Sequence, residues 1–271
     1  MAASGGKNAA EYISHHLTNW QVGSGIMAVN IDTVIFSLLA GGVILFIAWL
    51  VGRRLTSGRP GRLQNFIEMV VEFINGQVRE TFPVKDPFIG PLAITIFLWV
   101  AMMNAIDLIP VDFFPSLAGW VGRLFGLKPE QVHLHALPTA DLSVPLAMAL
   151  SVFVFIFIYN MRYRGLKNYL KHYVSHPYGI WVLPFNILMN TIEELARPLS
   201  LALRLWGNFF AGDLIFMLIA LFGFSIWVAP IQVALGWAWT WFELLEVLLQ
   251  AFIFMLLSTV YLAMTVQQDE H

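Results

Sequence analysis

The stretch "SLALRLWGNFFAGDLIF", Ser200–Phe216, is apolar enough to lie in a lipid bilayer, yet it contains Arg204 and Asp213. An arginine at the centre of a lipid-facing helix costs about 2.5–3.5 kcal/mol on insertion scales, so a charge inside a membrane segment usually faces protein or water and has a function. At about 100° per residue, Asp213 lies on the opposite side of the helix from Arg204. The stretch therefore predicts a membrane helix whose arginine needs a partner or a cavity elsewhere.

The composition of the whole chain also indicates a membrane protein. Of the 271 residues, 58% are hydrophobic and 12% are charged, whereas about a quarter of the residues in a soluble domain are charged. The absence of cysteine excludes disulfides and cysteine-ligated metals, and the formal net charge of −2 does not suggest a nucleic-acid partner. We predict an all-α integral membrane protein that forms a single membrane domain over residues 1–271.

Two basic clusters set the predicted topology. They follow expected spans over 33–52 and 142–161, and a third span is expected over 88–110 between them. Such clusters mark the cytoplasmic side of a membrane, so the leader over 1–32 and the N-terminus lie on the extracytoplasmic side, and the C-terminus is cytoplasmic. The clusters consist of Arg53, Arg54, Arg59 and Arg62, and of Arg162, Arg164, Lys167 and Lys171. Apolar residues at helical spacing over 63–82 predict an amphipathic helix on the membrane surface.

Two further apolar runs, over 179–222 and 231–266, are too long to cross the bilayer upright. At about 1.5 Å per residue they would extend about 65 Å and about 50 Å, against a hydrocarbon thickness of about 30 Å. We expect an antiparallel hairpin of two long, strongly tilted helices, which brings the membrane helices to five. An alternative, in which the first run divides into two short spans at Pro198, stays open.

Polar side chains recur along both long runs. On the first, residues at near whole-turn offsets share the face of Arg204: Glu193, Arg197, Ser200, Asn208 and Ala211. On the second, Glu243, Glu246 and Gln250 lie on one face. Antiparallel pairing would bring Arg204 opposite Gln250 and Asp213 within about a turn of Glu243. Asn190 and Glu193 lie about 17–21 Å from Arg204, toward the cytoplasmic end.

This arrangement suggests a mechanism of proton transfer. Carboxylates and amides in water-filled clefts can pass protons, whereas arginine is effectively never deprotonated. A fixed cation between two half-channels would block a direct leak, and it would lower the pKa of a passing carboxylic acid so that the acid releases its proton. A rotating carrier with many carboxylates would match such a device.

At these residues the sequence resembles subunit a of the bacterial F-type rotary ATP synthases. The resemblance covers nearly the whole chain and rests on "RPLSLALRLWGNFFAGDLIF" (197–216), "LLQAFIFMLLSTVYLAM" (248–264) and "PLAITIFLWVAMMNAIDLIP" (91–110). It implies a proton-channel stator subunit of the bacterial inner membrane that has no ATP chemistry and no cofactor of its own. The implied partners are a ring of c subunits, the b-subunit peripheral stalk, the lipid bilayer and, indirectly, the soluble catalytic head.

The resemblance also assigns roles to residues. It implies that Arg204 is the essential arginine facing the ring, that Asp213, Asn208 and Gln250 belong to the half-channel path, and that Ser200 lies near the ring contact. Three positions depart from the family pattern. Asp213 stands where glutamate is common, and Glu243 stands where close relatives have histidine, so we expect two carboxylates that titrate as a coupled pair. Asn190 replaces an acid of the cytoplasmic path, and we expect Glu193 to take its role.

Several alternatives remain at this stage. Arg204 could form a structural ion pair with Glu193 or Glu243. Asp107 and Asp141, at the ends of spans, could be solvated interfacial carboxylates or the periplasmic mouth of a channel. No histidine pair has a third ligand at metal spacing, so no metal site is predicted. Alternative functions are a self-contained secondary transporter with a midplane substrate site, which usually shows repeated halves that this sequence lacks, and a structural membrane anchor.

Overall fold

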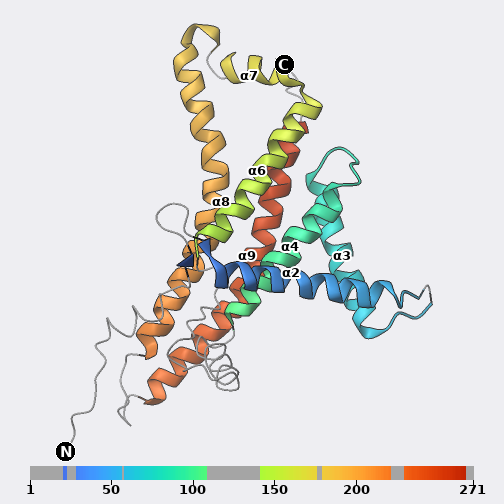
Figure 1. The fold of residues 1–271 in the computed structure, drawn as a ribbon, viewed down its shortest axis with the longest axis vertical. Helices are drawn as coiled ribbons and strands as arrows, with labels where there is room; N and C mark the ends of the chain where they lie inside the picture. The colour runs from blue at the N-terminus through green and yellow to red at the C-terminus, as the bar shows by residue number, and fades with distance from the viewer. Residues whose placement is uncertain are drawn as a thin grey trace, which may run out of the picture. The chain divides into compact units, whose positions relative to one another are not determined.

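The computed structural model describes residues 21–22, 29–56, 58–108, 141–175, 179–220 and 229–266. The chain is helical apart from two strands of two residues each, β1 (Gln21–Val22) and β2 (Val29–Asn30), which pair antiparallel with Gln21 opposite Asn30. The helices, drawn in Figure 1, are α2 (Ile31–Gly52), α3 (Arg62–Thr81), α4 (Ile89–Asp107), α6 (Ser143–Tyr163), α7 (Leu166–Ser175), the short 3-10 helix η3 (Ile180–Val182), α8 (Leu183–Ala220) and α9 (Ala229–Val266).

Four of these helices contain segments long and apolar enough to cross a membrane. These segments are Thr33–Gly52, Ile89–Ile106, Ser143–Tyr163 and Ala229–Val266. In the apolar window of the first, only 11% of the residues are buried inside the protein. A helix that is apolar on all sides and uncovered by protein is stable in lipid rather than in water. The predicted helical membrane protein is confirmed at this level.

The chain divides into two compact units. Unit 1 comprises Met1–Gly42, Met102–Asp141 and Trp206–Leu248, and unit 2 comprises Val43–Ala101, Leu142–Leu205 and Leu249–His271. Helices α2, α4, α8 and α9 each contribute residues to both units. Arg204 therefore belongs to unit 2, whereas Glu243 belongs to unit 1.

Helix α8 runs without interruption for 38 residues, with Pro198 inside it. A proline within a helix removes one backbone hydrogen bond and usually bends or breaks the helix. Here the buried Pro198 is accommodated, so the alternative of two short spans divided at this proline is wrong. At about 1.5 Å per residue, α8 and the equally long α9 each extend about 57 Å.

Within unit 1, the segments of α8 and α9 run antiparallel. The carboxylate of Glu243 lies against Gly212, and the amide of Gln232 donates to the carbonyl of Ile219 at 3.0 Å. A contact nearer the end of α8 thus pairs with a residue nearer the start of α9. In unit 2, the guanidinium of Arg197 on α8 lies 5.7 Å from the ring centre of Tyr261 on α9.

Helix α7 was not predicted from the sequence. Hydrogen bonds attach it to α8 within unit 2. Asn186 is fully buried, and its amide donates to the carbonyls of Val174 at 3.1 Å and Gly179 at 2.8 Å. The hydroxyl of Tyr169 donates to Glu194. Burial, together with this bond, raises the pKa of Tyr169, which keeps the hydroxyl protonated as a donor. The spacing of Leu166, Tyr169, Leu170 and Tyr173 was a signal for this helix.

The linker between α3 and α4 is held to α6 through Asp86, also in unit 2. Its carboxylate accepts hydrogen bonds from the Phe88 amide at 2.9 Å and from the hydroxyls of Tyr159 at 3.0 Å and Tyr163 at 3.3 Å. Burial alone would raise the pKa of Asp86. The three hydrogen bonds and the attraction of Arg162 outweigh that effect, so the pKa of this carboxyl lies below its ordinary value.

Candidate functional site

Arg204 projects from the less buried side of α8. Leu201 is 2% exposed, and Ala202 and Leu205 are fully buried, so these residues define the face that packs against the protein. Ser200 and Leu203 are exposed on the other side, and Arg204, about a third of a turn from the packed face, is partly exposed. Packing of the apolar residues therefore determines the direction in which the arginine points.

Within the described ranges, Arg204 has no ion-pair or hydrogen-bond partner. Glu193, proposed above as its possible structural mate, instead pairs with Arg197 one turn later, with 2.5 Å between Nη2 and Oε1. Arg197 also stacks on Tyr261, so its charge is satisfied locally. The interpretation of Arg204 and Glu193 as a structural ion pair is therefore wrong.

Glu243 on α9 is held by two contacts in unit 1. Its Oε1 accepts a hydrogen bond from Trp239 Nε1 at 3.1 Å. The same oxygen would lie 3.0 Å from a Cβ atom placed on Gly212. Glycine at this position thus allows the carboxylate to lie against the backbone of α8, next to the position of Asp213. The side chain of Asp213 itself lies outside the described part of the chain.

The remaining polar residues of the long helices differ in burial. Gln250 on α9 is 3% exposed, while Asn208 on α8 and Glu246 on α9 are partly exposed. Asn190 on α8 donates its amide to the carbonyl of Tyr173 at 2.7 Å, so this side chain helps to attach α7. Its expected place on a cytoplasmic path stays a prediction.

A buried amide was missed by the sequence analysis. Asn104 on α4 is fully buried, and neither its Oδ1 nor its Nδ2 has a hydrogen-bond partner among the residues whose positions are described. Buried amides are nearly always hydrogen-bonded, to protein or to water. The sequence signal that could have identified Asn104 is the single amide side chain of "MMNAI" within an otherwise apolar span.

Of the two carboxylates at the ends of spans, Asp107 and Asp141, the structure describes the contacts of Asp141 only. Asp107 ends α4, and its side chain lies outside the described residues. Asp141 precedes α6 and accepts hydrogen bonds from the Asn30 amide and, at 3.3 Å, from the Thr33 hydroxyl. Within unit 1, it therefore bonds to the start of α2. The residues that the structure describes contain no cluster of three or more metal-ligating side chains.

Comparison with known proteins identifies the family. Residues 34–263 match the family model described as "ATP synthase A chain". The ATP synthase subunit a of Haemophilus influenzae strain PittEE is 45% identical over 268 residues, which cover 98% of this chain and 99% of that protein. The subunit a of Idiomarina loihiensis is 46% identical over 271 residues, covering 99% of each chain. That of Alkalilimnicola ehrlichii is 44% identical over 266 residues, covering 98% of this chain and 99% of the relative.

The described geometry is consistent with these matches, because the matched region covers the arginine on α8 and all but the outermost residues of the apolar spans and of the two long helices. Since the family model covers most of the chain and the relatives match it from end to end, this chain belongs to the ATP synthase A chain family, whose members are named ATP synthase subunit a.

Proposed function

We propose that this chain is the stator subunit that conducts protons to and from the rotating c-ring of a bacterial ATP synthase. It performs no ATP chemistry itself. It supplies two offset aqueous half-channels, which open to opposite sides of the membrane, and an arginine that separates them. The peripheral stalk of b subunits would hold it stationary against the soluble head while the ring turns.

The observation that carries this proposal is the unpaired state of Arg204 in a membrane protein. An intramembrane guanidinium keeps its proton and requires a counter-charge or water. Across the ranges that are described, no acid of this chain supplies that charge. The c-ring carboxylates would supply it in turn, each giving up its proton as it meets the arginine, because a nearby cation lowers the pKa of an acid.

The extracytoplasmic half-channel would be formed by residues of unit 1. Glu243 lies beside the backbone that precedes Asp213, and Asn104 offers a buried amide that water could satisfy. The carboxylate of Asp213 would join that of Glu243 in this path, and the two would then titrate as a coupled pair. Asn208, one turn after Arg204 on α8, and Glu246, one turn after Glu243, extend the polar lining toward the arginine, and Asp107 and Asp141 would line the mouth.

The cytoplasmic half-channel would be formed by residues of unit 2. Gln250 is buried on α9, and Glu193 with Asn190 lies toward the start of α8. Ser200, exposed on the side of α8 where Arg204 points, would lie at the contact with the ring. In this arrangement the chain has five membrane helices, α8 and α9 form a tilted hairpin, the N-terminus is periplasmic and the C-terminus is cytoplasmic.

The proposal is tested by replacing Arg204 with alanine in the assembled enzyme. Arg204→Ala should abolish ATP synthesis driven by a proton gradient in inverted membrane vesicles, because c-ring carboxylates would then pass without releasing their protons. The matched control is Arg54→Ala, which removes the same charge from the basic cluster that follows α2, outside the proposed path, and should retain coupled synthesis. Normal synthesis by the Arg204→Ala enzyme would exclude the proposed role.

A further inference from the structure

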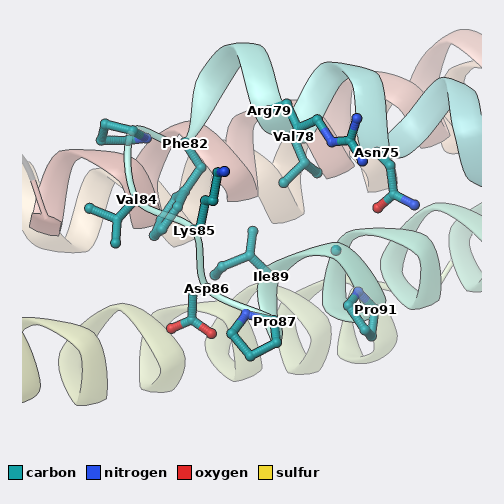
Figure 2. Close-up of a pocket in the computed structure, with 12 residues that line it drawn as sticks. Asn75, Val78, Arg79, Phe82, Val84, Lys85, Asp86, Pro87, Ile89 and Pro91 are labelled. Atoms are coloured by element: carbon teal, nitrogen blue, oxygen red, sulfur yellow. The ribbon is translucent and has the colours of Figure 1, made fainter.

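A pocket of about 600 Å³ in unit 2 lies outside the proposed proton path. It is formed by the second half of α3, the linker before α4 and the first turn of α4 (Figure 2). Part of its wall is apolar: Val78, Phe82 and Ile89 line it and are all buried. Because α4 begins a membrane span at Ile89, the pocket lies at the level where hydrocarbon meets the polar headgroups of the bilayer.

Two cations line this pocket without neutralisation. Neither Arg79 nor Lys85 forms an ion pair or hydrogen bond with any other residue of the described ranges. The acid that also lines the pocket, Asp86, is bonded to the Phe88 amide and to Tyr159 and Tyr163. Figure 2 shows the Asp86 carboxylate pointing away from Arg79 and Asn75. The charge that the pocket offers to a ligand is therefore positive.

The backbone and an amide add to this character. Ile89 and Gly90 belong to the first turn of α4, where the helix dipole and backbone N–H groups that have no acceptor within the helix favour an anion, whereas Pro91, which also lines the pocket, has no N–H. The side chain of Asn75 packs onto Gly90, where a Cβ atom would lie only 2.8 Å from Asn75 Oδ1. The glycine thus allows the amide to lie at the pocket wall, one helical turn from Arg79.

The surface next to the pocket is apolar and open. Val84, which lines the pocket, and Phe88, which stands between the lining residues Pro87 and Ile89, are exposed, and exposed apolar surface of this kind beside two cations is typical of a contact with lipid or protein. A phosphate with attached acyl chains satisfies both features: arginine and lysine bind the phosphate, while the chains cover the aromatic and aliphatic surface. Basic pockets beside membrane helices on the cytoplasmic side bind anionic lipid headgroups in this way.

We propose that this pocket binds the phosphate of an anionic phospholipid through Arg79 and Lys85, with Asn75 as an additional polar contact. A phospholipid with net negative charge is preferred to a zwitterionic one, because the pocket offers two cations and its carboxylate is already occupied by hydrogen bonds. The proposal is independent of the proton-transfer function, since none of these residues belongs to the proposed half-channels.

The test uses photoactivatable phosphatidylglycerol in vesicles that contain the assembled enzyme, followed by mapping of labelled peptides. Wild-type chain should be labelled within 75–91, and phosphatidylcholine carrying the same photoactivatable group should label this segment much less. The double variant Arg79→Gln/Lys85→Gln should lower the labelling by about tenfold, since charge-assisted hydrogen bonds are lost. Gly90→Ala, which changes no charge but displaces Asn75, should lower it by about threefold.

The matched control is Arg59→Gln/Arg62→Gln, which removes two charges from the basic cluster at the start of α3 and should leave the labelling of 75–91 within about twofold of wild type. An equal loss in this control would attribute the labelling to general surface charge and overturn the proposal. Absence of labelling within 75–91 in the assembled enzyme would indicate that a protein partner covers the pocket. Loss of labelling on addition of millimolar inorganic phosphate would assign the pocket to free phosphate. Either result would also overturn it.

Discussion

Gly212→Ala tests whether the position of the Glu243 carboxylate matters for proton transfer. The added Cβ atom would lie 3.0 Å from Oε1, whereas ordinary contacts begin at 3.4 Å, so the carboxylate must retreat by about 0.4 Å. A displacement of this size lengthens the bond from Trp239 Nε1, now 3.1 Å, to at most about 3.5 Å, where a hydrogen bond is very weak.

Two opposing terms determine the stability of this variant. Alanine is favoured over glycine within a helix by about 1 kcal/mol, while weakening a hydrogen bond to a carboxylate costs part of about 1.5–3 kcal/mol. The free energy of unfolding should therefore change by less than about 1 kcal/mol. Proton conduction, which depends on distances between donors and acceptors, should fall about fivefold to tenfold, since a misplacement near 1 Å can cost a reaction about a hundredfold.

The assay is proton conduction through vesicles from which the catalytic head has been stripped, together with thermal unfolding of the membrane sector. Gly236→Ala on α9 is the matched control, because no atom lies within 4 Å of the Cβ position there. It should gain helix stability and conduct normally. If Gly212→Ala conducts as well as Gly236→Ala, the contact between Glu243 and α8 has no part in proton transfer, and the reasoning fails.

Two other predictions concern the parts of unit 2 that support the long helices. Because the pKa of Asp86 is lowered in the folded protein, its carboxylate stabilises the fold above the ordinary aspartate pKa, and this stabilisation is lost as pH falls through the lowered pKa. Asp86→Asn should remove this part of the pH dependence. The measurement is the melting temperature as a function of pH. An identical pH profile for wild type and variant would contradict it. Asn186→Ala leaves the carbonyls of Val174 and Gly179 without their donor and should destabilise the attachment of α7 to α8 by about 1–3 kcal/mol. The loss should be measured as faster hydrogen exchange of the backbone amides in α7, and unchanged exchange would show that these bonds contribute little.

Much of the fold follows from local properties of the chain. Whether a segment can enter a bilayer depends on its length and hydropathy, so the apolar spans could be predicted without knowledge of any neighbour. The amphipathic spacing that predicted a helix over 63–82 is local in the same sense, and α3 occupies Arg62–Thr81. Arg204 stood out for a related reason, because a permanent cation within an apolar run is costly wherever the rest of the chain lies.

Other features depend on contacts between segments that are distant in sequence. The continuity of α8 through Pro198 was left open because the cost of an interior proline is offset by packing that the residue pattern does not specify. Asn190 carried a proton-path expectation, yet its amide bonds the carbonyl of Tyr173. Helix α7 was missed because its basic residues had been attributed to topology, although the apolar spacing was present.

The sequence by itself determined that this protein is a helical membrane protein of the ATP synthase A chain family, because hydropathy and the motif around Arg204 are both properties of a continuous stretch of chain. Only the tertiary structure decided which polar side chains are bound to neighbours and which are free to take part in proton transfer. In it Glu193 forms an ion pair with Arg197, Glu243 lies against Gly212, and Asp86 accepts hydrogen bonds from two tyrosines. The physical reason is that the rotation and register of packed helices depend on the fit between their surfaces, which no single stretch of sequence contains.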